Sequence, residues 1–260
     1  MKTLKLLFVL CALVAFTPNT QAQTAEEIVD NFFENTGGMD AWKKIKSMKA
    51  TGTASFGPQK FPFIMYTMVD GRMAAEVDLQ GSKFIPQAFD GEKQWAMNFQ
   101  TMEAEAADSE ASQNYKANEA KDFPDPFLDY KSKGYTISYE GKETIEGTEA
   151  FKVKLTKNPI MVDGKEEAHS VMYYFDTENY VPIVSEEKIT SGPQKGMVQQ
   201  TLYSEYLEAG DIFYPYTFDV KMGGQVVQSI NMTEVEFNAD IDESIFVMPE
   251  KATPAEGTKN

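Results

Sequence analysis

The sequence is poor in the side chains on which most enzyme chemistry depends, with one cysteine, Cys11, and one histidine, His169, in 260 residues. Cys11 lies in the apolar run near the N-terminus, so the rest of the chain has no disulfide, thiolate metal ligand or cysteine nucleophile. HExxH and G-x-S-x-G motifs are absent, and His169 has no second histidine with which to share a metal. We therefore expect no catalytic residue, no metal and no cofactor. Paired carboxylates leave a secreted hydrolase open as the least favoured alternative.

Basic residues are also scarce, since 24 Lys and Arg face 40 Asp and Glu and give a net charge of −16. Such a chain repels phosphate backbones, so we expect no nucleic-acid partner. The only arginine is Arg72, directly after the Asp70–Gly71 turn. It is either a bidentate donor to carboxylate or ester oxygens at the rim of a pocket, or a turn residue that faces water.

Long apolar runs are limited to residues 6–16, which follow Lys2 and Lys5 and precede a small-residue site ending at Ala22. This layout predicts a signal peptide over residues 1–22 that is removed after Ala22. The run is too short for a hydrocarbon core of ~30 Å, and Cys11 lies too early in it for lipidation. We expect a periplasmic, unlipidated protein with a flexible polar tail over residues 250–260.

What the sequence does contain is a long series of β-strand signals. A Thr24-x-x-Glu27 capping box first starts a helix that ends at Gly37–Gly38. Turn dipeptides then separate alternating segments, which predicts a mainly β fold with a single large antiparallel sheet, curved into an unclosed barrel. A change of apolar phase near Thr233–Glu234 predicts a β-bulge. The predicted strands cover residues 48–56, 61–69, 72–80, 83–89, 93–99, 135–145, 149–157, 168–176, 181–190, 197–208, 213–222 and 225–237.

Residues 101–121 interrupt this pattern, because they are rich in Ala and Glu and contain no β-branched residue after Thr101. We interpret them as a marginal helix, followed by a proline-kinked connector over residues 123–128. Within a single domain over residues 23–249, an insertion near residues 101–130 is then a helical lid that opens and closes over a cavity. A rigid helix covering a sheet edge is the alternative.

Three predicted strands are apolar on both faces, at residues 61–69, 171–175 and 212–218. One face can pack on helices while the other lines a cavity, for which Met and Tyr are suited. A closed sandwich core without a cavity is the alternative. The candidate ligand-binding residues of the cavity wall or rim are Phe63, Met65, Tyr66, Arg72, Trp95, Met172, Tyr174, Tyr214 and Phe218.

Four segments of the chain carry a resemblance to a known family: residues 24–49, the Asp90-Gly-x-x-x-Trp95 turn, residues 176–183 and the closing residues 242–249. In these the chain resembles the LolA/LolB-like superfamily of periplasmic lipoprotein carriers, and most of all the outer membrane lipoprotein-sorting proteins of Bacteroidetes-type bacteria. The resemblance implies an unclosed barrel whose helices form a lid over an apolar cavity. In that family a functional arginine lies in a Lys-Arg-Pro stretch, whereas residues 69–73 here read Val-Asp-Gly-Arg-Met.

The same resemblance implies a function and partners. It implies a non-catalytic carrier or chaperone that binds the acyl chains of lipoproteins or other lipids for delivery to the outer membrane. An acylated lipoprotein or lipid is then the cargo, and an inner- or outer-membrane protein is a possible partner. A lipid- or partner-sensing interaction domain of the cell envelope is the alternative, because one fold supports several functions.

Overall fold

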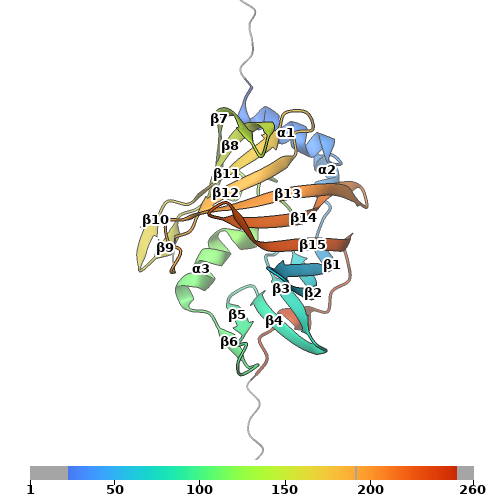
Figure 1. The fold of residues 1–260 in the computed structure, drawn as a ribbon, viewed down its shortest axis with the longest axis vertical. Helices are drawn as coiled ribbons and strands as arrows, with labels where there is room; N and C mark the ends of the chain where they lie inside the picture. The colour runs from blue at the N-terminus through green and yellow to red at the C-terminus, as the bar shows by residue number, and fades with distance from the viewer. Residues whose placement is uncertain (1–22, 191, 251–260) are drawn as a thin grey trace, which may run out of the picture.

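Thirteen antiparallel strands form one continuous sheet in the computed structural model, which describes residues 23–190 and 192–250 (Figure 1). The strand order is β6-β5-β4-β3-β2-β1-β15-β14-β13-β12-β11-β8-β7, and a separate hairpin pairs β9 with β10. The end strands β6 and β7 do not pair with each other, so the sheet stays open. This confirms the predicted single, unclosed antiparallel sheet. The predicted signal peptide over residues 1–22 and tail residues 251–260 lie outside the described residues.

Most neighbouring strands are joined by hairpins, as the turn dipeptides predict. The strands are β1 (Ser47–Phe56), β2 (Gln59–Met68), β3 (Met73–Leu79), β4 (Ser82–Phe89), β5 (Gln94–Met97), β6 (Ala104–Ala106), β7 (Thr136–Ile145), β8 (Thr148–Thr156), β9 (Ile160–Val162), β10 (Lys165–Glu167), β11 (Ser170–Asp176), β12 (Pro182–Lys188), β13 (Val198–Ala209), β14 (Ile212–Met222) and β15 (Gln225–Phe237). The β-bulge is also confirmed, because Thr51 faces Glu234 and Gly52 faces Met232, which leaves Thr233 as the extra residue.

The helices are short and few in the described part of the chain: α1 (Ala25–Asn35), α2 (Met39–Trp42), α3 (Ser109–Ala117) and the 3₁₀ turns η1 (Glu119–Lys121) and η2 (Glu243–Phe246). The capping box is present as predicted, since the Glu27 amide donates to Thr24 Oγ1 (3.1 Å) and the Thr24 amide donates to Glu27 Oε2 (3.0 Å). The first two helices lie at one end of the molecule, and β4 to β6 lie at the other (Figure 1).

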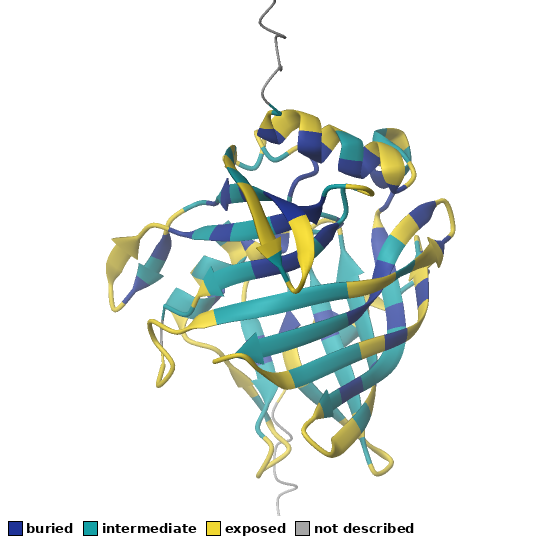
Figure 2. Cartoon of the chain, turned by 45° about the horizontal axis from the view of Figure 1, so that its top comes forward, coloured by how far each residue is buried: buried dark blue, intermediate teal, exposed yellow. Residues whose placement is uncertain are grey.

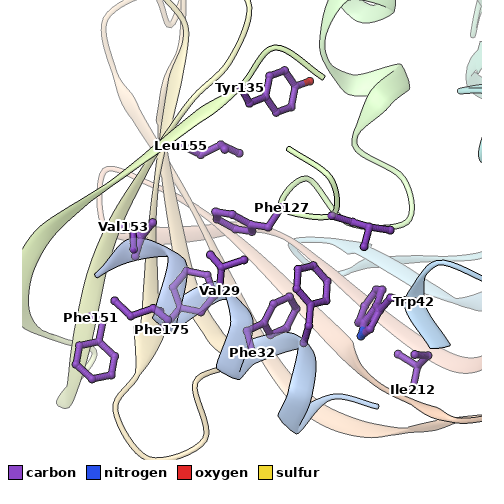
Figure 3. Packing of buried hydrophobic residues seen from close by; sticks show 14 of the residues in the cluster. Val29, Phe32, Trp42, Phe127, Tyr135, Phe151, Val153, Leu155, Phe175 and Ile212 are labelled. Atoms are coloured by element: carbon purple, nitrogen blue, oxygen red, sulfur yellow. The ribbon is translucent and has the colours of Figure 1, made fainter. Parts of the chain in front are cut away.

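The main hydrophobic core lies between α1 and the strands of the C-terminal half. Figure 3 shows Phe32 and Trp42 beside Phe127, which comes from the proline-kinked connector, and Phe175 of β11. Full burial of one such side chain contributes roughly 1.5–3 kcal/mol. The Trp42 indole N–H donates to Thr36 Oγ1 (3.0 Å), so the buried indole is also satisfied. This packing fixes the helices and the connector against the sheet (Figure 2).

The predicted helix over residues 101–121 is wrong in its first third. Residues Ala104–Ala106 form β6, which pairs with β5, and α3 begins only at Ser109. Two side chains explain the difference. Asn98 Oδ1 accepts from the amides of residues 100 and 101 and closes a tight turn, and Asp108 Oδ1 accepts from the Ala111 amide (2.7 Å) as the helix N-cap. Local capping by Asn and Asp therefore outweighs the helix propensity of Ala and Glu.

Candidate functional site

An apolar cavity of about 570 Å³ is enclosed by β1 to β4 together with β14 and β15. Among its walls only Gln87, Gln228 and the Tyr214 hydroxyl are polar side-chain groups. The lining residues are Ala54, Phe56, Phe61, Phe63, Met65, Met73, Ala75, Val77, Leu79, Phe84, Pro86, Gln87, Phe99, Tyr214, Phe218, Gln228, Ile230 and Met232. This size and composition are typical of a site for an apolar small molecule.

The position of β2 in the fold explains why its sequence is apolar on both faces. Phe61, Phe63 and Met65 alternate along one face and line the cavity. Tyr66 and Met68 lie on the other face, in a cluster built around Trp95 and the C-terminal segment. Alternate residues of a strand point to opposite faces. One face of β2 therefore packs against the C-terminal segment, and the other lines the cavity. The odd-numbered residues of β2 are therefore the ones that face the cavity.

A glycine in β1 makes room for the most buried of these rings. A Cβ atom at Gly52 would lie 2.2 Å from the Asn231 carbonyl oxygen and 2.9 Å from Cε1 of Phe63. Phe63 itself is paired with Gly52 across the β1–β2 ladder. Because a side chain at position 52 would clash with both neighbours, the glycine allows the Phe63 ring and the bulged strand β15 to approach β1.

Aromatic side chains surround the open end of the cavity, which we call the mouth and define by Phe56, Phe61, Phe84 and Phe99. Phe56 and Phe61 have ring centroids 6.3 Å apart, and Phe84 and Phe99 meet edge to face at 5.8 Å. Phe99 is 71% exposed and Phe56 is 46% exposed. Large exposed rings at the entrance of an apolar cavity indicate a surface that meets an apolar ligand or surface.

Four of the nine predicted site residues line the cavity, namely Phe63, Met65, Tyr214 and Phe218. Tyr66 and Trp95 lie on the opposite face of the sheet, where the Trp95 indole N–H donates to the Phe246 carbonyl oxygen (2.8 Å). These two side chains attach the C-terminal segment to the sheet. Their apolar character, which suggested a cavity wall, is explained by this packing.

Arg72 also lies outside the cavity walls. Its guanidinium binds the carboxylates of Asp70 (2.8 Å) and Glu243 (2.7 Å) and lies 5.4 Å from the centroid of the Phe246 ring. These partners raise the pKa of Arg72 and lower the pKa of Glu243. The bidentate donor that the sequence suggested is thus present, but the carboxylates it binds belong to the protein. Ligand recognition by Arg72 stays a prediction.

Met172 and Tyr174 lie on the side of β11 that faces away from α1. They pack with Val184 and Leu202, and the Tyr174 hydroxyl donates to Glu186 Oε2 (2.8 Å). Val171, Tyr173 and Phe175 alternate with them, and Tyr173 and Phe175 pack in the main core. The two-sided apolar pattern of β11 therefore reflects two packed clusters, and no residue of β11 lines the apolar cavity.

Sequence reasoning missed much of β3, β4 and β15. Met73, Val77 and Leu79 line the cavity from β3, and Ile230 and Met232 line it from β15. A signal for β3 was available, because residues 73, 75, 77 and 79 are apolar and alternate with Ala74, Glu76 and Asp78. Extending the alternation of β2 across the Asp70–Gly71 turn would have placed these residues on the same face.

The helix α3 contributes no side chain to the cavity lining. It packs instead against the β9–β10 hairpin, where Asn114 exchanges two hydrogen bonds of 2.7 Å with the backbone of Met161, and against β5, where the Ser112 hydroxyl accepts from the Gln94 amide (3.1 Å). Glu110 accepts from the amides of Asp163 and Gly164. A lid movement of this segment stays a prediction.

His169 is buried at the start of β11, and its Nε2 lies 2.7 Å from Glu187 Oε1. In residues 23–190 and 192–250 no group of three or more His, Cys, Asp or Glu side chains is arranged to hold a metal ion. The described helices also include none that is both long and apolar enough to span a bilayer.

Comparisons with known proteins give structural matches only. No family model matches the sequence, and no curated protein matches it. The fold is similar to that of a LolA superfamily protein from Nitrosomonas europaea, with a TM-score of 0.54, 11% identity, and 87% of this chain and 98% of that chain covered. A domain described as an outer membrane lipoprotein-sorting protein, from Vibrio parahaemolyticus, has a TM-score of 0.52 and 12% identity over 85% of this chain and 94% of that one.

A DUF1329 family protein from Desulfovibrio piger is similar to the same degree, with a TM-score of 0.52, 12% identity, and 85% of this chain and 96% of that chain covered. At these identities the likeness concerns the fold. The chain has a LolA-like fold, as its sequence segments suggested.

Proposed function

We propose that this chain, whose fold is LolA-like, is a periplasmic, non-catalytic carrier or chaperone that binds the acyl chains of lipoproteins or other lipids. The observation that carries the proposal is the cavity of about 570 Å³, whose walls are almost entirely apolar. Such a volume lies within the range of small-molecule sites. The proposed cargo is an acylated molecule, and delivery to the outer membrane through a membrane partner protein is part of the proposal.

The energetics of acyl chains explain why a carrier needs this cavity and little else. Burial of each CH₂ group contributes about 0.8 kcal/mol, so a chain of about sixteen carbons costs on the order of 12 kcal/mol in water. Met65, Met73 and Met232 in the walls supply adaptable side chains that fit chains of different shape. Binding and release require an opening, which the aromatic mouth supplies, and no reacting group.

A displacement assay tests the proposal. The chain is titrated with a fluorescent long-chain fatty-acid probe, which is then displaced by unlabelled palmitate. We expect saturable binding, and at least a tenfold loss in Met65→Glu, because a carboxylate in the cavity wall has to be desolvated next to the acyl chain. Leu207→Glu is the matched control, since Leu207 is 50% exposed on β13 and lies outside the cavity. Equal binding by both variants, or no binding by the wild-type chain, contradicts the proposal.

A further inference from the structure

A second, smaller hollow of about 120 Å³ adjoins the apolar cavity, and the two share Tyr214 and Phe218 as walls. We call it the Asp125 pocket. Its walls come from the first two helices (Phe32, Trp42), from residues 124–127 of the connector, and from β11 to β14. Unlike the apolar cavity, it contains one carboxylate and four tyrosines, Tyr173, Tyr203, Tyr206 and Tyr214.

The Asp125 side chain is half-buried in this pocket, and its carboxylate has no cation paired with it among the described residues. The carboxylate accepts from two backbone amides, those of Phe127 (2.8 Å to Oδ1) and Leu128. The charge of Lys133 acts on this carboxylate, but its ammonium donates to the backbone carbonyl oxygens of Asp125 (2.7 Å) and Pro126 (3.4 Å). In the described part of the chain no Lys, Arg or His forms an ion pair with this carboxylate. Burial raises the pKa of Asp125 to about 7.

The four tyrosines differ in how their hydroxyls are engaged. The Tyr203 hydroxyl bonds to Ser185 Oγ (2.8 Å), and the Tyr206 hydroxyl donates to the Pro182 carbonyl oxygen (2.7 Å). Among the described residues, the hydroxyls of Tyr173 and Tyr214 have no hydrogen-bond partner, although both line the pocket. Burial raises the pKa of all four phenols, so they stay neutral. Two free hydroxyls and one carboxylate oxygen are thus available to a ligand.

The polar groups lie at the end of the hollow near the helices, whereas the mouth at the other end is aromatic. This arrangement is the reverse of the one expected for a cavity that binds the tail of an amphiphile and leaves its head in water. On the basis of the proposed function, we propose that the chain binds its ligand head-in. A small polar head with hydroxyl or ammonium donors occupies the Asp125 pocket, and the acyl chain extends past Tyr214 and Phe218 toward the mouth.

Two physical limits define the head group. A volume of about 120 Å³ corresponds to roughly four water molecules, so only a small head such as a glycerol or an amine fits. An unpaired carboxylate accepts hydrogen bonds from hydroxyl or ammonium groups and repels carboxylate or phosphate groups. The ligand class is therefore a single-chain amphiphile with a neutral or cationic donor head.

Three ligands with the same chain length test this inference at pH 8, above the pKa of Asp125: monopalmitoylglycerol, hexadecylamine and palmitate. Displacement of the fluorescent probe gives their affinities. For the wild-type chain we expect both donor-headed ligands to bind at least tenfold more tightly than palmitate. Preference for the amine alone, or for the glycerol ester alone, identifies the source of the donor and supports the inference.

Variants locate the preference in the pocket. In Asp125→Asn we expect palmitate to gain and hexadecylamine to lose affinity, so that their ratio falls at least tenfold. Asp129→Asn is the control, because Asp129 is an exposed carboxylate two residues beyond Phe127 that pairs with Lys43 (3.3 Å). If Asp125→Asn does not fold, Tyr214→Phe, which removes one free hydroxyl and keeps the ring, replaces it and should weaken monopalmitoylglycerol about fivefold, the value of one hydrogen bond.

The failures of the two proposals are distinguishable. If the wild-type chain binds all three ligands equally well and neither pocket variant changes the ratios, the head-in inference is overturned and the acyl-carrier proposal stands. If a folded wild-type chain binds none of the three, both are overturned. Tighter binding of palmitate than of the other two also overturns the inference, because it places the head outside the Asp125 pocket.

Discussion

Arg72 and Glu243 form an ion pair in which Nη1 lies 2.7 Å from Oε2, although 171 positions separate them in the sequence. The guanidinium also covers the Phe246 ring, and Trp95 binds the carbonyl oxygen of the same residue. The C-terminal segment with η2 is thus attached to the outer face of the sheet, opposite the cavity.

Arg72→Ala tests this structural role. We expect the midpoint of thermal unfolding to fall by a few degrees, because the stacking on Phe246 and two charge-assisted hydrogen bonds are lost together. Palmitate affinity should stay within twofold of wild type. Lys60→Ala, at an exposed lysine of β2, is the control. A large loss of ligand affinity without a loss of stability would instead assign Arg72 to ligand binding.

Asp125 makes stability depend on pH. Burial raises its pKa to about 7 in the folded chain, compared with about 3.9 in an unfolded one. The folded state therefore binds the Asp125 proton more tightly than the unfolded state does. The stabilisation of the folded state by this proton is fully present below about pH 4 and is lost as the pH rises through 7. The four tyrosines line the same pocket, and the charges of Asp122 and Lys133 act on Asp125 from outside it. All six side chains are unchanged in an Asp125 variant.

Asp125→Asn imitates the protonated side chain, so it should gain stability over wild type as the pH rises from 4.5 to 8. The upper limit of this gain is about 4 kcal/mol, because the pKa values of Asp125 in the folded and the unfolded chain differ by about 3. Urea unfolding of both chains at the two pH values measures it. If the difference in stability between the two chains is the same at pH 4.5 and pH 8, the pKa of Asp125 is not raised in the folded chain.

Lys157 anchors the start of the connector, because its buried ammonium lies 2.7 Å from Asp122 Oδ2 and 3.6 Å from Glu119 Oε1. Lys157→Met should lower the free energy of unfolding by about 3 kcal/mol, since Asp122 then keeps its charge without a cation, although Tyr135 still donates to its Oδ1. Lys154→Met, on β8 three residues earlier and at a less buried position, is the control and should cost under 1 kcal/mol. Similar losses in both variants would mean that the pair does not anchor the connector.

The helix α3 is the part of the fold that we expect to move. It fully buries only Ser112, whereas α1 buries five side chains. Its amides should therefore exchange hydrogen faster than those of α1 in the empty protein, and they should become protected when monopalmitoylglycerol is added. Exchange of α3 as slow as that of α1, or unchanged by ligand, would identify α3 as a fixed cover of the β9–β10 hairpin.

The sequence was informative wherever structure depends on neighbouring residues. Turn dipeptides and alternation predicted the antiparallel sheet, and the phase change from Met232 to Val235 located the bulge at Thr233. Helix propensity failed for residues 101–108, where Asn98 and Asp108 side chains fix the backbone.

The candidate site was harder to predict, because an apolar residue can face a cavity or a packed neighbour. Tyr66 and Trp95 are covered by residues 241–246, and Tyr174 by its own cluster. Contacts this distant in sequence leave no trace in local periodicity. Asp125 was also missed as a pocket residue, since one aspartate between two prolines has the composition of an ordinary turn.

Native mass spectrometry of the protein purified from its own cells tests the central claim most directly. We predict a complex whose mass exceeds that of the polypeptide by a lipid or a lipid-bearing molecule, present in wild type and in Leu207→Glu and absent in Met65→Glu. A wild-type protein that carries no such mass, and acquires none when incubated with monopalmitoylglycerol, would contradict the account.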